Sequence, residues 1–438
     1  MTTSESASTG KSREAAMPFI MLTVLIDMVA IGLIIPVLPH LVGTFTTSAT
    51  DKTLWFGVVA FAFGIANFFG SPVLGALSDR FGRRPVLLIG FSGLALSFFV
   101  TAVASALWML IVVRLFSGAM QANIAVANAY VADISPPDQR AKRFGLLGAM
   151  FGIGFILGPA AGGMLGGIDL HLPFYVAGTL ALVNCVYGVL VLPESLPADR
   201  RRPFEWKRAN PVSALAGLAQ LQGIGLLVGV IGLSGLAQFT LHMTWVLYTD
   251  LKFGWGPLET GWSLFAVGIM SALVQGLLLG RLLKRFSARR LAVMGLMSST
   301  LAFLAWGAAS EGWMMYAVIA ANLLGFAGTA AIQSIVSNAA DARTQGQTMG
   351  AVAGLNSLMA VIAPIVGPAL LAMVSHLPRG DWRIGAPYYF CAVLQGLATV
   401  LAIYHFRTHR AATAVTAAQP GTTPAGQLTS DRWVESAL

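Results

Sequence analysis

The amino-acid sequence predicts an all-α membrane protein in which twelve transmembrane helices form two pseudo-symmetric six-helix halves. Composition is the first observation behind this prediction: 56% of the 438 residues are hydrophobic and only 10% are charged. Soluble domains carry about a quarter charged residues, so this chain lacks the polar side chains needed to cover a surface in water. The second observation is a series of long apolar runs, and the third is an internal repeat.

Twelve apolar runs are long enough to cross a bilayer, for which a helix needs about 20 residues. In chain order the predicted spans are residues 18–40, 54–77, 85–104, 107–130, 144–165, 172–192, 221–248, 260–283, 291–309, 313–338, 349–374 and 387–405.

Basic residues predict the orientation of these spans. They are concentrated near both termini and in the even-numbered connections, whereas the odd-numbered connections hold only Lys52, Lys252, Arg379 and Arg383. Because cytoplasmic loops carry an excess of Lys and Arg, we expect both termini in the cytoplasm. The formal charge of +9 follows from this bias, so we expect a lipid bilayer and no nucleic acid as the partner.

The longest polar interruption divides six spans from six. It contains four prolines and three consecutive arginines between residues 193 and 211. The terminal segment is rich in Ala, Thr, Gly and Pro, a composition typical of disorder. The predicted units are an N-terminal half (1–197), a cytoplasmic linker (198–213), a C-terminal half (214–410) and a disordered cytoplasmic tail (411–438).

The two halves repeat each other. The segment from Gly75 to Arg84 after the second span aligns with the segment from Gly280 to Arg289 after the eighth, at a single offset of 205 residues. Two repeated halves that rock about a central site are the architecture of alternating access, which indicates transport and not catalysis.

Four motifs lie within the first five predicted spans or directly after one of them: Asp27 to Pro39, Gly75 to Arg84, Arg114 to Gly118, and Gly154 to Gly163. Together they resemble the major facilitator superfamily, and within it the Tet-type drug:proton antiporters. The resemblance runs from Asp27 to about Trp313. It implies the fold of that superfamily, and its fifth-span motif marks antiporters and so favours export.

The chain departs from that family at three positions. Tet-type metal–tetracycline exporters, as the resemblance implies, carry acidic and histidine side chains in spans three, eight and nine. The corresponding residues here are Ser97, Ser271 and Ser299. The departure argues against exchange of a metal–tetracycline complex, whereas the antiporter class is unaffected.

Proton coupling is predicted for the two charges that lie deep inside spans, Asp27 and Arg114. A charge within the bilayer costs about 2.5–3.5 kcal/mol on insertion scales, so such residues are usually functional. Asp27 is expected to bind and release the exchanged proton. The alternative is a static ion pair between Asp27 and Arg114.

A conformational gate is predicted at the cytoplasmic ends of the spans. Gly75 permits close helix contact, and Gly82 permits an unusual backbone. Asp79 is expected to face a helix N-terminus of the other half, and Arg83 or Arg143 to pair with Asp79 or Asp133. The alternative is that these basic residues only set topology. The predicted gate consists of Gly75, Asp79, Arg80, Gly82, Arg83, Asp133 and Arg143.

The fifth span contains glycines whose spacing gives a flat face for close packing. We interpret it as a hinge, or a seal between the halves on the exterior side. Its members are Gly154, Gly158, Pro159, Gly162 and Gly163.

Polar side chains at helical spacing predict the substrate site. In span four, Arg114, Gly118, Gln121, Ala125 and Asn128 share one face of a helix. Span seven carries a second stripe. The alternative for both is a packing seam, because apolar spans need polar groups to associate. The predicted contacts are Asn67, Gln121, Asn128, Gln238, His242, Trp245 and Gln275.

The sequence therefore predicts a proton-coupled exporter of small drug-like or antibiotic molecules, with tetracyclines among the candidates. The rival interpretations are a proton-coupled importer of a sugar or metabolite and a transport-dead receptor or scaffold. Cys185 and Cys391 lack metal or disulfide spacing, and no catalytic motif is visible. We expect no enzyme activity, no cofactor and no metal site, and a monomer in the bacterial inner membrane.

Overall fold

The computed structural model describes residues 3–121, 123–136, 138–206, 210, 225–339 and 345–417. Within these ranges the regular structure is helical. The N-terminal half contains α1 (Thr3–Ile34), α2 (Leu38–Gly43), α3 (Ala49–Phe81), α4 (Arg83–Ala102), α5 (Leu107–Met120), α6 (Asn123–Ile134), α7 (Arg140–Ile168) and α8 (Leu172–Val191). A short turn of helix, Ala198–Arg200, follows.

The C-terminal half contains α10 (Gly225–Phe253), α11 (Pro257–Leu273), a π-helical turn (Val274–Leu278), α12 (Leu279–Arg285), α13 (Ala288–Ala308), α14 (Gly312–Ala321), α15 (Leu323–Ala339), α16 (Gln345–Ala372), a short turn of helix (Trp382–Gly385) and α17 (Ala386–Ala417). Residues 418–438 of the predicted tail, and most of the predicted linker, lie outside the described residues. α17 itself continues beyond Arg410, where the tail was predicted to begin.

Eleven spans in the described part of the chain are long and apolar enough to cross a membrane. The twelfth is a bent pair, Gly312–Ala321 and Leu323–Ile335, whose axes differ by 48°. The prediction of twelve transmembrane helices is therefore confirmed when the bent pair is counted as one span.

Several spans are broken where the sequence predicted a continuous helix. The first span turns at Ile35 to Val37, beside Pro36, before it resumes as α2. The fourth ends its first helix at Met120, and Gln121 leaves helical geometry with φ −86° and ψ 63°. The helical stripe predicted from Arg114 to Asn128 is therefore wrong in its geometry, because it assumed one uninterrupted helix.

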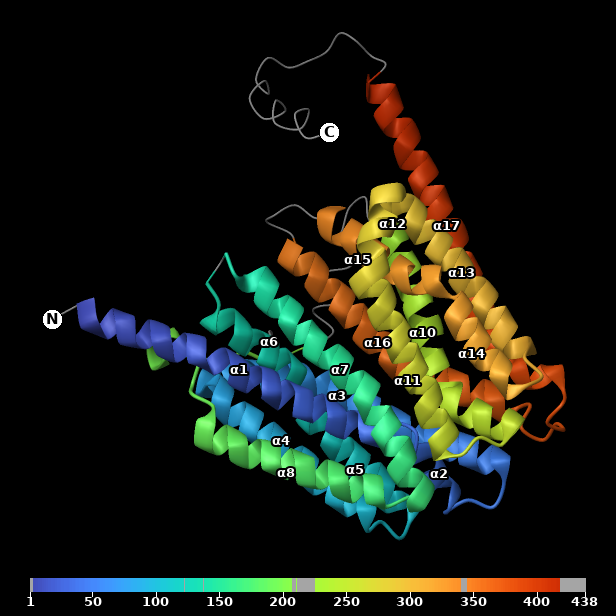
Figure 1. Cartoon of the computed structure of the whole chain (residues 1–438), viewed down its shortest axis with the longest axis horizontal. Coiled ribbons are helices and arrows are strands. Elements are labelled where there is room, and N and C mark those ends of the chain that lie inside the picture. The colour runs from blue at the N-terminus through green and yellow to red at the C-terminus, as the bar shows by residue number, and fades with distance from the viewer. Residues whose placement is uncertain are drawn as a thin grey trace.

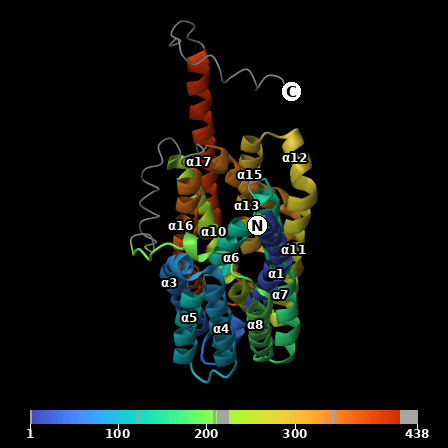
Figure 2. The same ribbon diagram turned by 90° about the vertical axis from the view of Figure 1, so that its left-hand side faces the viewer.

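The two halves meet along two helix pairs, α7 with α11 and α3 with α16 (Figures 1 and 2). They are close together near α2 and diverge towards the ends that carry the chain termini. The space around two glycines of α3 shows how the distance between the halves changes along this helix. A Cβ on Gly57 of α3 would lie 2.8 Å from the Pro364 carbonyl oxygen of α16, whereas one on Gly75, near the other end of α3, meets nothing within 4 Å.

Polar contacts join the halves at the closed end. Lys52 at the start of α3 forms an ion pair of 2.5 Å with Asp250 of α10. The hydroxyl groups of Thr50 and Ser375 are 2.7 Å apart. The bundle is thus closed on the face opposite the termini and open on the face that carries them, which is the predicted cytoplasmic face.

Candidate functional site

Asp27 lies near the middle of the first span and is buried, with 3% of its surface exposed. It borders a small cavity of about 10 Å³ between α1, α4, α6 and α7, whose other walls are mainly apolar, as at Val24, Leu87 and Phe91. Such a volume is about that of one water molecule. A carboxyl group is thus held in a mainly apolar setting, with room for about one water molecule beside it.

Arg114 on α5 is also buried, with 6% of its surface exposed. Its Nε and Nη2 atoms have no hydrogen-bond partner among the described residues. Guanidinium nitrogens left without partners in a low-dielectric interior are costly. A static ion pair that satisfied Arg114 fully would not leave two of its nitrogens in this state.

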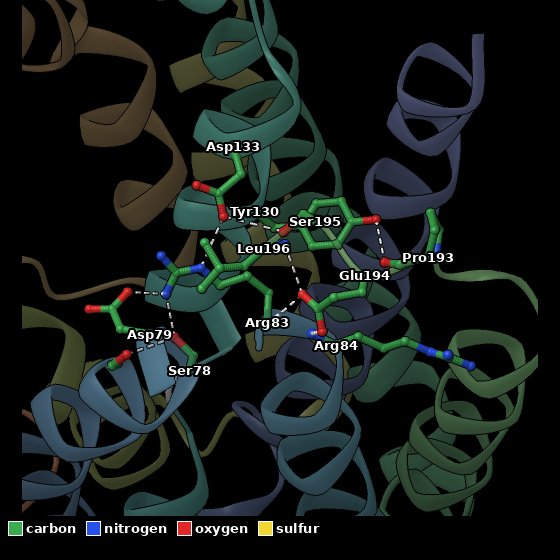
Figure 3. A network of polar contacts seen from close by, with 11 residues as sticks. Ser78, Asp79, Arg83, Arg84, Tyr130, Asp133, Pro193, Glu194, Ser195 and Leu196 are labelled. Atoms are coloured by element: carbon green, nitrogen blue, oxygen red, sulfur yellow. Dashed lines mark hydrogen bonds and ion pairs between the residues drawn. The ribbon is translucent and has the colours of Figure 1, made fainter. Parts of the chain in front are cut away.

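The predicted gate contains a network of polar contacts at the open end of the N-terminal half (Figure 3). The Arg83 guanidinium is buried between two carboxylates: Nη1 lies 2.6 Å from Oδ1 of Asp79, and Nε donates to Oδ2 of Asp133 at 3.1 Å. It also donates to the Ser78 hydroxyl at 2.5 Å. Arg83 therefore ties the end of α3 to the end of α6.

Glu194 is a member of this network that the sequence analysis missed. Its carboxylate accepts hydrogen bonds from the backbone N–H groups of Arg83 at 2.9 Å, Arg84 at 3.3 Å and Leu196 at 3.0 Å. The first two N–H groups begin α4, so Glu194 caps that helix with a negative charge. Gly82, with φ 107°, makes the turn that brings α4 to this position.

Of the two arginines expected to pair with Asp79 or Asp133, Arg83 pairs with both. Asp79 is on the same half as its partner Arg83 and does not reach a helix of the other half, because the halves are apart at this end. Arg143 donates instead to the Ile134 carbonyl oxygen and to Gln139, each at 3.0 Å. Arg80 is exposed and lies over the Phe81 ring.

The glycines of the fifth span pack closely, but mostly within their own half. A Cβ on Gly158 of α7 would lie 2.6 Å from the Gly32 Cα of α1, and Gly154 and Gly162 also face α1. Gly163 alone of the predicted glycines faces the other half, where its Cβ would lie 2.8 Å from the Gly261 Cα of α11. The Pro159 carbonyl oxygen also faces the other half, since a Cβ on Gly261 would lie 2.6 Å from it. Pro159 and Gly163 thus contact α11, the other glycines join α7 to α1, and a role as a seal stays a prediction.

A larger cavity, of about 260 Å³, lies in the C-terminal half. Gln238 of the predicted stripe lines it, together with the neighbouring Ser234. Ser299, one of the positions that departs from the Tet-type pattern, lies in its wall. Other polar side chains around it are Thr329, Gln333, Asn356 and Gln395.

The remaining predicted substrate contacts do not line this cavity. Trp245 is buried and donates its indole N–H to the Ser263 hydroxyl at 2.9 Å, so it is part of the core in this conformation, and its contact with substrate stays a prediction. His242 lies beside the cavity residue Gln238, with 3.4 Å between their nitrogens. The others lie at different places in the bundle: Asn67, Gln121 and Asn128 in the N-terminal half, and Gln275 in the π-helical turn, where it donates to Ser271.

Comparison with known proteins adds independent observations. The sequence model of the Major Facilitator Superfamily matches the chain twice, over residues 20–246 and 227–435. The chain is 35% identical to the class C tetracycline resistance protein of Escherichia coli over 368 residues, which are 84% of this chain and 92% of that protein. It is 29% identical to multidrug resistance protein 2 of Bacillus subtilis (strain 168) over 84% of this chain and 89% of that protein.

Solved structures resemble the fold as well. The human organic anion transporter MFSD10 (TETRAN) has a TM-score of 0.65 at 23% identity, covering 89% of this chain and 99% of that one. The nucleoside transporter NupG has a TM-score of 0.68 at 15% identity, covering 90% and 98%. At these identities the likeness concerns the arrangement of helices.

Proposed function

Because the chain belongs to the Major Facilitator Superfamily, we propose that it exports small drug-like or antibiotic molecules from the cytoplasm in exchange for protons. The family and fold identify the protein as a multi-pass membrane protein and a secondary transporter, not an enzyme. We propose in addition the direction of transport, the class of substrate and the coupling ion.

The observation that carries the proposal is the buried carboxyl group of Asp27. It lies within a span, 3% exposed and beside a small, mainly apolar cavity. An ionisable group in this position is costly to the fold, and proton-coupled transporters use such groups as their proton sites. Arg114, also buried in the same half, supplies the positive charge that would influence its protonation.

The direction is supported by the relatives. The proteins that match most of the chain include tetracycline resistance and multidrug resistance proteins, whose names describe resistance to drugs. The match to the class C protein covers 84% of this chain and therefore extends over both halves. These features favour export over the import of a sugar or metabolite.

Transport in membrane vesicles tests the proposal. Inside-out vesicles with an acidic interior should accumulate a transported drug, and an ionophore that removes the proton gradient should abolish the accumulation. Asp27→Asn fixes the neutral form, so uphill transport should disappear while downhill exchange of the same drug persists. The matched control is Asp169→Asn, which removes a carboxylate from the exposed turn before α8. Full uphill transport by Asp27→Asn would overturn the assignment of the proton site.

A further inference from the structure

One carboxamide from each of four helices borders the cavity of the C-terminal half. They are Gln238 of α10, Gln333 of α15, Asn356 of α16 and Gln395 of α17. Every carboxamide offers two N–H donors and a carbonyl acceptor. The four groups together can therefore pair with both hydrogen-bond donors and acceptors of a bound molecule. The first helix of the C-terminal half, α10, and its last three, α15 to α17, thus bring the same chemistry to one space.

The exposure of these amides distinguishes a binding site from a packing seam. Amides that hold membrane helices together are buried against a neighbouring helix. Gln238 and Gln333 are instead exposed and Asn356 is half-buried, whereas Gln395 is buried. Inside a membrane protein, exposed amides that line a cavity gain from a ligand that supplies hydrogen bonds.

Glycines shape the walls of this cavity. A Cβ on Gly328 of α15 would lie 2.6 Å from the Gly295 Cα, so these residues bring α13 and α15 into backbone contact on one side. On the other side, a Cβ on Gly235 would lie 3.4 Å from the Asn356 side-chain oxygen. The small residue at 235 therefore leaves the Asn356 amide uncovered.

The rest of the lining is apolar or hydroxylic. Phe239, Leu296 and Ile332 provide apolar surface, while Ser234, Ser299 and Thr329 provide hydroxyl groups. Among the described residues that line the cavity, none is ionisable. A ligand with a net charge would lose its hydration here without gaining a partner of opposite charge.

We infer that this cavity binds an uncharged molecule with an apolar body and carbonyl, amide or hydroxyl groups along its edges, without a metal ion. The inference rests on the proposed function in one respect, since it takes the bound molecule to be the transported substrate. The cavity, about 260 Å³, is near the lower limit of small-molecule sites, which are typically about 300–1,000 Å³.

Equilibrium dialysis on the purified full-length protein in detergent tests the inference. Two neutral probes, chloramphenicol and florfenicol, carry an amide and hydroxyl or halogen groups on an apolar body. Tetraphenylphosphonium serves as a permanent cation, and tetracycline with Mg²⁺ as a metal chelate. At least one neutral probe should bind, and EDTA should leave its affinity unchanged.

Variants locate the binding. Gln333→Leu and Asn356→Leu should each weaken binding of the neutral probe by about tenfold, the effect of losing one well-placed hydrogen bond to the probe. Asn356→Asp should weaken neutral binding and improve binding of tetraphenylphosphonium, a gain that misfolding cannot produce. Ser357→Leu is the matched control, because Ser357 is adjacent on α16 but exposed outside the cavity lining.

The results separate this inference from the proposed function. Binding of a neutral probe that depends on Gln333 and Asn356 supports the inference even if vesicles show no proton-driven transport. Failure of both neutral probes to bind, a requirement for Mg²⁺, or unchanged affinity in both leucine variants would overturn it. Proton-driven transport of tetraphenylphosphonium alone would overturn the inference and leave export intact.

Discussion

At the scale of single residues, the N-terminal half buries two charges inside apolar spans, Asp27 and Arg114. Both are recognisable in the sequence because a charged residue interrupts an otherwise apolar run. The position of Trp245 could not be recognised from its spacing alone. Helical spacing places it on the same stripe as Gln238, but only the packed structure reveals that its N–H is already used by Ser263.

Glu194 could not be identified from the sequence for a different reason. It follows the sixth apolar run directly, where an acidic residue at the membrane boundary is unremarkable. Its role depends on the first turn of α4, which is far away in the chain and whose N–H groups it accepts. In the sequence, Glu194 is marked by its position directly after Pro193, where the chain leaves the predicted sixth span towards the linker.

We predict that Glu194→Gln lowers the stability of the N-terminal half. The amide oxygen can still accept a hydrogen bond, but the negative charge at the N-terminus of α4 is lost, at a cost of about 1 kcal/mol. Thermal unfolding in detergent should show a lower Tm. The matched control is Glu311→Gln, since Glu311 is at the N-cap of α14 but makes no capping hydrogen bond. Equal Tm values for the two variants would show that the cap contributes nothing.

At the scale of helices, apolar length predicts where spans occur but not where they break. Spans four and ten, which correspond in the two halves, are both interrupted beside an amide, at Gln121 and at Asn322. The Asn322 side chain accepts a hydrogen bond from Ser298 of α13, a partner that no local pattern reveals. An amide beside each break is a local feature that the two spans share.

The packing of α7 on α1 gives a prediction at this scale. Gly158→Leu should lower the Tm and abolish transport, because the added side chain has no room beside Gly32 and would force the two helices apart. Overpacking of this kind typically costs about 1–3 kcal/mol. Gly152→Leu is the control on the same helix, where a Cβ meets nothing within 4 Å. If both variants transport equally well, the close contact between α1 and α7 is not needed.

At the scale of the whole molecule, the repeat in the sequence predicts two halves and alternating access, but not which face is closed. The structure is closed opposite the termini and open beside them (Figure 1). The expected contact of Asp79 with the other half is absent in the described part of this conformation, because that contact requires the open end to close. The proposed proton site, Asp27, and the cavity lined by four carboxamides lie in different halves. Under the proposal, coupling between them would require movement of the two halves.

The ion pair between Lys52 and Asp250 provides the last prediction, because it joins the two halves at the closed face. Both side chains are partly buried, with 17% and 31% of their surfaces exposed. A pair of this kind contributes on the order of 0.2–1 kcal/mol, enough to change a two-state ratio by up to about fivefold. Lys52→Met should therefore shift the population towards the state that is open on this face, and Asp250→Lys combined with Lys52→Asp should restore it.

Spin-label distances measured across the closed face, in a chain freed of Cys185 and Cys391, report that population directly. The matched control is Asp381→Asn, which breaks the 2.6 Å pair with Arg383 inside the C-terminal half. Hydrogen bonds from Arg383 lower the pKa of Asp381, so this control pair is fully charged at neutral pH. The Asp381–Arg383 pair is similar in length to the Lys52–Asp250 pair but lies within one half. Asp381→Asn should therefore leave the distance distribution unchanged from the wild type. A shift of equal size in Lys52→Met and Asp381→Asn, or no recovery in the charge-swapped double variant, would show that the pair between the halves does not hold this face closed.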